Sequence, residues 1–332
     1  MMFGTVVIFG GTGFIGSHLA QTLARENRAA TIFLCDIAPP RPAFKFDDRV
    51  CYVPADVRKP IAAPDLPEAV DLVVNLAAIH REPGHELHEY YETNLLGAEN
   101  VCEFAERTNC RNLIFTSSIA PYGPSEAEKT EESIPTPVSA YGGSKLAAEK
   151  IHIGWQRADK GRRLVIVRPG VVFGPGEGGN VSRLVKATIR RYFLYMGNRQ
   201  TRKAGGYVKE LAYTMLWALD RLPESGGVLL YNFSMAKTPT VEEYVETACR
   251  VAGIQRYVPM VPYPLLLAAS YGIEAVTRPL GIKQPVSPVR IRKLVRSNNI
   301  QPAVLLREGY QYRYDLEAAM RDWKNDRPDE WQ

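Results

Sequence analysis

The 332-residue sequence has few features of a secreted, disulfide-bonded or membrane-spanning protein. Its five cysteines, Cys35, Cys51, Cys102, Cys110 and Cys249, are scattered and include no Cys-x-x-Cys pair, which argues against a disulfide framework and against a zinc site. No apolar run approaches the roughly 18 to 20 residues that cross a bilayer, and no basic, cleavable leader precedes the first apolar segment. We therefore expect reduced cysteines, no metal, no integral membrane segment and a cytoplasmic protein.

Acidic residues are scarce in one part of the chain. Residues 160–209 hold twelve lysines and arginines against one acidic residue, Glu177, although the whole chain has a net charge of only +5. Such a local positive field attracts small anionic ligands. Nucleic acid is the other anionic partner to consider, but the aromatic interleaving and recognition motifs that accompany it are missing. We expect a small anionic substrate and no nucleic acid.

Short β-branched apolar runs alternate with longer helical patterns in the first half of the chain. The runs cover residues 5–9, 31–35, 50–53, 72–76, 113–116 and 164–168. This alternation predicts an α/β protein with a parallel sheet covered by helices. We assign 1–170 to that domain, and 171–332 mainly to a smaller α/β region for the substrate, allowing for strands or helices that return to the first domain.

A later apolar stretch, residues 265–276, is open to two interpretations. It is either a buried helix or dimer contact, which we favour, or a surface helix that touches a membrane.

A glycine-rich turn, GGTGFIG at residues 10–16, joins the first predicted strand to a helix. Gly10 permits the tight turn, Gly13 lets the backbone approach a pyrophosphate, and Gly16 allows close helix–strand packing. Asp36 ends the second strand twenty residues after Gly16, where a carboxylate accepts hydrogen bonds from the adenosine ribose. A carboxylate also repels a 2′-phosphate, so the sequence predicts NAD rather than NADP, a preference that the nearby Arg41 would soften.

Tyr141 and Lys145 lie four residues apart at the start of a predicted helix, and therefore on one helix face. A neighbouring ammonium favours the tyrosine anion, which makes the phenol competent in proton transfer near neutral pH. Ser118 follows the strand at 113–116, at the carboxyl edge of the sheet where ligands of this architecture bind. These three residues are the predicted catalytic set.

Taken together, these motifs resemble the extended short-chain dehydrogenase/reductase family, in particular its NAD-dependent nucleotide-sugar epimerase and dehydratase branch. The resemblance covers nearly the whole chain and implies a Rossmann-type doubly wound parallel sheet. It implies that Tyr141 is the base and acid, that Lys145 lowers the tyrosine pKa and holds the nicotinamide ribose, and that Ser118 hydrogen-bonds the reacting oxygen. The implied cofactor contacts are Gly10, Thr12, Gly13, Phe14, Ile15, Gly16, Asp36, Asp56, Val57, Leu76, Ala77, Ala78, Asn94, Thr116, Tyr141, Lys145 and Arg168.

The same resemblance implies a nucleotide-diphosphate sugar as substrate and a homodimer formed through helices near 90–106 and 146–155. The candidate substrate contacts are His80, Arg81, Ser118, Tyr141, Asn180, Arg202 and Arg290.

Four positions depart from the branch. Many epimerases have an Asn that contacts the diphosphate where this chain has Val171. The 4,6-dehydratases have an Asp-Glu pair where this chain has Ile119 and Ala120, so elimination lacks its acid and base. Family members commonly have an Asp or Asn after the tyrosine-valine of the second region, where this chain has Glu210. The leading hypothesis is an epimerase acting at C4 through a transient 4-keto sugar. A net oxidoreductase, such as a 4-keto sugar reductase or a hydroxysteroid-like dehydrogenase, and a non-catalytic NAD-binding protein are the alternatives.

Overall fold

The computed structural model describes residues 1–332 except 63, 82–83, 278–287, 289–290 and 293–294. Arg290, one of the predicted substrate contacts, lies outside the described residues.

Seven parallel strands form the central sheet in the order β11-β7-β5-β4-β1-β2-β3. All six predicted strands belong to it, and the seventh comes from the second half of the chain. The sheet confirms the predicted doubly wound α/β fold. Its strands are β1 (Phe3–Phe9), β2 (Ala29–Asp36), β3 (Val50–Pro54), β4 (Leu72–Asn75), β5 (Asn112–Thr116), β7 (Arg163–Pro169) and β11 (Gly227–Phe233).

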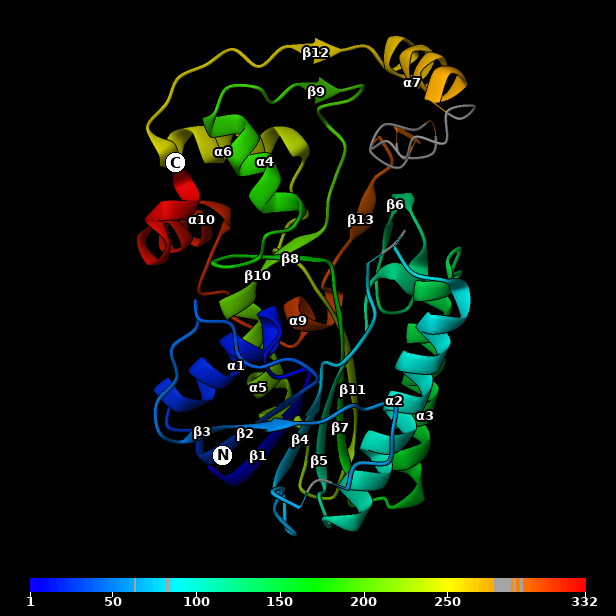
Figure 1. The fold of residues 1–332 in the computed structure, drawn as a ribbon, viewed down its shortest axis with the longest axis vertical. Helices are drawn as coiled ribbons and strands as arrows, with labels where there is room; N and C mark the ends of the chain where they lie inside the picture. Colours follow the sequence, from blue (N-terminus) through cyan, green and yellow to red (C-terminus); the bar gives the residue numbers. More distant parts are fainter. Residues whose placement is uncertain (63, 82–83, 278–287, 289–290, 293–294) are drawn as a thin grey trace.

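Helices cover both faces of this sheet because successive residues of a strand point to opposite sides. In β1, Val6 and Ile8 pack into one apolar core and Val7 and Phe9 into the other, and all four are fully buried. The first core is completed by α1 (Phe14–Arg25), α5 (Val208–Arg221) and α9 (Ala303–Arg307), the second by α2 (Leu87–Arg107) and α3 (Ala140–Ala158). Figure 1 shows the two helical layers on either side of the sheet.

A smaller unit stands above the carboxyl edge of the sheet (Figure 1). Its core gathers Phe173, Tyr244 and Trp323, around which three helices and a 3₁₀ turn pack. Short parallel strand pairs connect the parts. The remaining elements, which lie in the smaller unit or along this edge of the sheet, are η1 (Ala120–Tyr122), β6 (Ser125–Lys129), β8 (Val171–Phe173), α4 (Asn180–Ile189), β9 (Tyr195–Met196), β10 (Gly205–Tyr207), α6 (Val241–Ala252), β12 (Met260–Val261), α7 (Tyr263–Thr277), β13 (Asn298–Ile300), α10 (Leu316–Asp326) and η2 (Pro328–Trp331).

Glu210 anchors the C-terminal segment to the first unit. Its buried carboxylate accepts hydrogen bonds from the Tyr310 hydroxyl and from the backbone N–H groups of Arg313 (3.0 Å) and Tyr314 (2.8 Å). Burial raises the pKa of this carboxyl. The longer side chain at this departure from the family pattern therefore has a structural role in this chain.

The helix α7 covers the apolar stretch 265–276, and its outer side is exposed, so it is not a core helix, whereas a dimer contact stays a prediction. Leu265 is 62% exposed, Tyr271 48% and Ile273 39%. An apolar pattern does not distinguish a core helix from one on a surface that another molecule covers. Among the described residues, no helix combines the length and apolar character needed to cross a membrane.

Candidate active site

Close backbone packing explains the glycines at residues 10–16. Gly10 has φ of 74°, and a Cβ there would lie 2.7 Å from the backbone nitrogen of Ala77. A Cβ on Gly16 would lie 2.6 Å from the carbonyl oxygens of Gly10 and Gly11. Gly11, which was not among the predicted contacts, is equally constrained, since its Cβ would lie 2.6 Å from the carbonyl oxygen of Ile8. Larger residues would push the turn off the strand ends.

The start of α1 has the features of a dinucleotide site. Gly13 is its N-cap and supplies no side-chain cap, so the first backbone N–H groups of the helix, those of Phe14 and Ile15 included, are free of side-chain caps and favour an anion. Beside this turn, the carbonyl oxygen of Ala38 accepts a hydrogen bond from the Thr12 hydroxyl (3.0 Å), and Asp36 ends β2 half-buried. These residues suit a dinucleotide whose diphosphate lies at the helix N-terminus.

Two buried polar atoms at the same sheet edge have no hydrogen-bond partner within the described part of the chain. They are Asn75 Oδ1 at the end of β4 and Thr116 Oγ1 at the end of β5. Buried polar atoms normally find hydrogen bonds. Their place at the carboxyl ends of central strands therefore suits a bound cofactor that lies across the edge.

Two predicted cofactor contacts, Asp56 and Val57, follow the end of β3. The Asp56 carboxylate forms an ion pair with Arg58 (2.7 Å), and this hydrogen bond lowers the pKa of Asp56. Val57 is buried against Gly97, where a Cβ would lie 2.9 Å from Val57 Cγ2. Leu76, Ala77 and Ala78 follow β4 and are half-buried.

Asn94 ties the loop after β4 to the catalytic helix. Its Oδ1 accepts from the backbone N–H of Ile79 (3.1 Å), while Nδ2 donates to the Ile79 carbonyl (3.3 Å) and to Ser144 Oγ (2.8 Å). Ser144 in turn donates to the carbonyl of Tyr141 (2.9 Å). Both amide protons of Asn94 are therefore used inside the protein, which gives this predicted cofactor contact a positioning role as well.

The structure brings the start of α3 against the segment that carries Ser118. The Ser139 side chain caps α3 by accepting from the Gly142 N–H (3.2 Å). A Cβ on Gly142 would lie 2.7 Å from the Ala120 carbonyl oxygen, so this glycine permits the close approach of α3. Ser118 Oγ is held by the Ala120 N–H (3.1 Å). Ser118 and Tyr141 are thus carried by two backbone segments in direct contact.

Lys145 lies one turn after Tyr141 and is only 2% exposed. Burial lowers its pKa to about 7, while the carboxylate of Glu149 acts in the opposite direction. Its Nζ lies 4.4 Å from the centroid of the Phe115 ring, a cation–π geometry that favours the ammonium.

His152 also packs against Phe115. Its ring stacks on Phe115 with centroids 3.9 Å apart. The Ala148 carbonyl accepts from Nδ1 (2.8 Å), which leaves Nε2 to accept from the Asn75 amide (3.2 Å). Burial lowers the pKa of His152 to about 3, so the ring is neutral and adds no charge beside Lys145.

Arg168, a predicted cofactor contact, forms a buried ion pair with Glu149. The Nη2–Oε2 distance is 2.6 Å and the Nε–Oε1 distance is 2.8 Å, with side-chain exposures of 5% and 1%. Ser117 Oγ donates to the same carboxylate (2.5 Å), and Arg168 Nη1 donates to the Tyr122 hydroxyl (2.6 Å). Sequence reasoning missed Glu149, although its position four residues after Lys145 on the catalytic helix is a usable signal.

The candidate substrate contacts fall into two groups. His80 and Arg81 are exposed in the loop after β4, where the Tyr90 hydroxyl donates to the Arg81 carbonyl and the Tyr90 ring centroid lies 6.3 Å from that of Tyr141. This places the loop beside the catalytic tyrosine.

The other group lies in the second unit. Asn180 begins α4, is exposed and accepts from Arg183 (3.2 Å). Arg202 is half-buried and donates through Nη1 to the Thr238 carbonyl (2.7 Å). Both side chains have protein partners, and their substrate contacts stay predictions.

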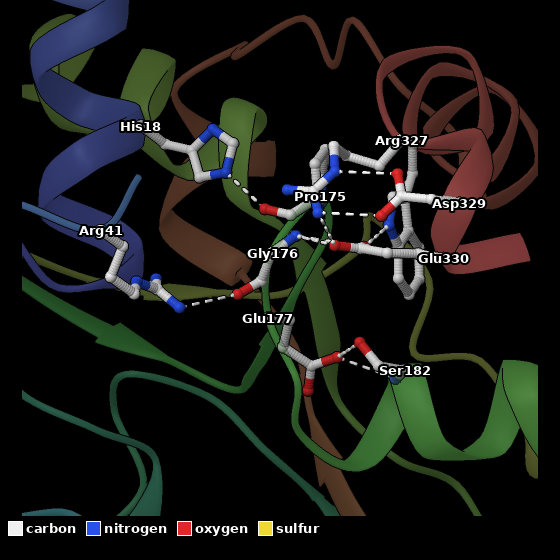
Figure 2. A network of polar contacts seen from close by, with 10 residues as sticks. His18, Arg41, Pro175, Gly176, Glu177, Ser182, Arg327, Asp329 and Glu330 are labelled. Carbon is white, nitrogen blue, oxygen red and sulfur yellow. Dashed lines mark hydrogen bonds and ion pairs between the residues drawn. The ribbon is translucent and has the colours of Figure 1, made fainter. Parts of the chain in front are cut away.

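A turn at residues 174–177 joins the two units (Figure 2). From the first unit, His18 Nε2 donates to the Pro175 carbonyl (2.9 Å) and Arg41 donates to the Gly176 carbonyl (3.1 Å). From the C-terminal segment, the Glu330 carboxylate accepts from the Gly176 N–H (3.1 Å). Burial lowers the pKa of His18 to about 4, so it acts as a neutral donor. The Arg41 guanidinium thus donates a hydrogen bond across the junction of the two units.

Comparison with known proteins agrees with this geometry. Residues 6–232 match the model of the NAD dependent epimerase/dehydratase family. The chain belongs to this family. It is an enzyme of the extended short-chain dehydrogenase type with NAD as its cofactor, as the sequence motifs predict.

Two curated relatives match almost end to end. The chain is 27% identical over 318 residues to N-acetyl-alpha-D-glucosaminyl-diphospho-ditrans,octacis-undecaprenol 4-epimerase of Escherichia coli O157:H7, covering 95% of this chain and 92% of the relative. It is also 27% identical over 351 residues to the decarboxylating sterol-4-alpha-carboxylate 3-dehydrogenase of Candida albicans, covering 97% and 98%. The solved UDP-glucose 4-epimerase of Thermus thermophilus in complex with NAD superposes with a TM-score of 0.71 at 21% identity, over 97% of this chain and 98% of that one.

Proposed function

We propose that this chain is an NAD-dependent 4-epimerase of a nucleotide-diphosphate sugar. The observation that carries the proposal is the intact Ser118, Tyr141 and Lys145 set, combined with apolar residues at the two neighbouring positions. Ile119 is only 8% exposed, and Ala120 has no titratable side chain. A site with no acid or base at the two positions after Ser118 suits reversible oxidation at one carbon rather than elimination. The names of the Escherichia coli and Thermus thermophilus proteins, both 4-epimerases, support the same reaction.

The proposed mechanism uses each residue at a stated atom. NAD, when bound, accepts a hydride from C4 and returns it. The Tyr141 phenolate takes the proton of the C4 hydroxyl as the hydride leaves, and holds it until the hydride returns. The Lys145 ammonium favours the phenolate electrostatically, and the Ser118 hydroxyl hydrogen-bonds the same sugar oxygen. Inversion requires that the 4-keto sugar present its other face before reduction, so no net oxidation occurs.

The test is a product assay with nucleotide sugars and the purified enzyme. We expect a mixture of the two C4 epimers by NMR, with no NADH accumulating at 340 nm. Stoichiometric formation or consumption of NADH would reject the epimerase. It would favour a net oxidoreductase, a reaction class suggested by the name of the Candida albicans relative.

We further infer that the chain acts in the cytoplasm as a homodimer. Five free cysteines, three of them buried, suit a reducing compartment. The helices α2 and α3, which pack side by side in Figure 1, would supply the predicted four-helix contact. Analytical ultracentrifugation tests the assembly, and a monomer would reject it. The domain division at residue 170 stays a prediction, with β11 and α5 joining the first sheet from beyond that boundary.

A further inference from the structure

The helix α7 exposes apolar residues to solvent and buries a polar one, the reverse of the usual pattern. Its fifteen residues contain one charged side chain, Glu274. The polar Ser270 is fully buried and donates to the Leu267 carbonyl (2.7 Å), whereas Leu265 is 62% exposed. A helix that is apolar all round is normally buried in a core or against a membrane. The outer side of α7 therefore requires an apolar or interfacial partner.

The exposed apolar surface continues beyond α7 onto a strand pair. The strands β9 and β12 run parallel, with Val261 opposite Met196, and β12 leads directly into α7 at the end of the molecule remote from the large sheet (Figure 1). Met196 is 44% exposed, Met260 52% and Tyr257 87%. We call the surface of Met196, Tyr257, Met260, Leu265, Tyr271 and Ile273 the outer apolar face.

Positive charge borders this face. The segments 190–200 and 254–277 together contain four arginines and one acidic residue, and of these arginines Arg199 pairs with Glu242 (3.0 Å). Arg191 is exposed, and Arg292 donates to the Tyr271 hydroxyl (2.5 Å), which fixes a guanidinium beside α7. An exposed apolar face accompanied by exposed arginines is typical of proteins that bind the interface of an anionic bilayer.

We propose that the outer apolar face docks on an anionic membrane surface. Leu265, Met260 and Tyr257 enter the region between headgroups and acyl chains, and Arg191 and Arg292 contact the phosphates. The proposal does not depend on the reaction catalysed, since it uses no residue of the active site. It describes peripheral attachment, in which no segment crosses the bilayer.

Vesicle flotation of the full-length enzyme tests this proposal. The probes are vesicles of phosphatidylcholine with phosphatidylglycerol, and vesicles of phosphatidylcholine alone. We expect the enzyme to float with the anionic vesicles at low salt. Binding should be much weaker to neutral vesicles, and also to anionic vesicles when the salt concentration is high. The double variant Leu265→Glu/Met260→Glu should bind at least about tenfold more weakly, because it loses two apolar insertions and adds two repelled charges.

A matched control adds the same charges elsewhere. Ile134 and Leu306 are 79% and 48% exposed and lie outside the outer apolar face, so Ile134→Glu/Leu306→Glu should float like the unmodified enzyme. Thermal melts and C4-epimer formation show whether both variants fold. The proposal is overturned if the unmodified enzyme does not float, or if both double variants bind equally. It is also overturned if Leu265→Glu/Met260→Glu changes only the oligomeric state, because the face would then be a contact between copies.

Discussion

Replacing Lys145 by methionine should stabilise the nucleotide-free enzyme at neutral pH while abolishing its turnover. The side chain is 2% exposed, and burial lowers its pKa from 10.5 to about 7. Burial of the Lys145 amine therefore lowers the free energy of unfolding at pH 7 by about 4 kcal/mol, at about 1.4 kcal/mol per pKa unit. The Phe115 ring 4.4 Å from Nζ offsets part of the cost, so this figure is an upper value.

The sign of the pH dependence follows from proton uptake. Between about pH 7 and pH 10.5 the unfolded chain holds the lysine proton and the folded chain has lost it, so this contribution to stability rises with pH in that window. The free energy of unfolding of Lys145→Met should therefore exceed that of the unmodified protein by about 4 kcal/mol at pH 7 and by about 2 kcal/mol at pH 9.

Urea unfolding followed by tryptophan fluorescence at both pH values measures this difference. Comparison of the two proteins at each pH cancels the titration of all other groups. Lys150→Met is the matched control, because Lys150 is exposed on the same helix and its replacement should leave the pH dependence unchanged. If Lys145→Met and the unmodified protein differed in free energy of unfolding by the same amount at both pH values, the folded lysine would not be desolvated. That result would refute the reasoning.

Three further predictions concern single residues. Tyr141→Phe should bind NAD and nucleotide sugar as before but lose turnover by roughly 10² to 10⁴, the scale of a general base, and near-normal kinetics would remove the catalytic assignment. Asp36→Ala should narrow the preference for NAD over NADP in binding titrations, because it removes a ribose acceptor and a repelling charge; equal affinities in the unmodified enzyme would contradict this. Glu149→Gln should destabilise the fold by about 3 to 5 kcal/mol, since it leaves the Arg168 guanidinium buried without its counter-ion, and a melting temperature within a degree of the parent would refute it.

Local patterns were sufficient to predict the large sheet and the cofactor turn. The six apolar runs of the first half all became strands of one parallel sheet, because a strand buried on both faces is apolar throughout. The spacing of Gly10, Gly13 and Gly16 was equally readable, since their constraints arise within one turn and the strands beside it. The Tyr141 and Lys145 pair was found for the same reason, as four residues make one helix face.

Long-range contacts decided the rest. Glu149 and Arg168 are nineteen residues apart and on different elements, so only the packing of α3 on β7 shows that they neutralise each other. His18, Pro175 and Glu330 likewise meet only after the C-terminal segment has folded back onto the first unit.

The same limit applies to the apolar stretch 265–276. Composition alone determined that these residues avoid water, but it did not determine what covers them. Burial is a property of the whole fold, because it depends on which elements from elsewhere in the chain pack on a surface. Only the tertiary structure shows that Ser270 faces the protein while Leu265 faces outward.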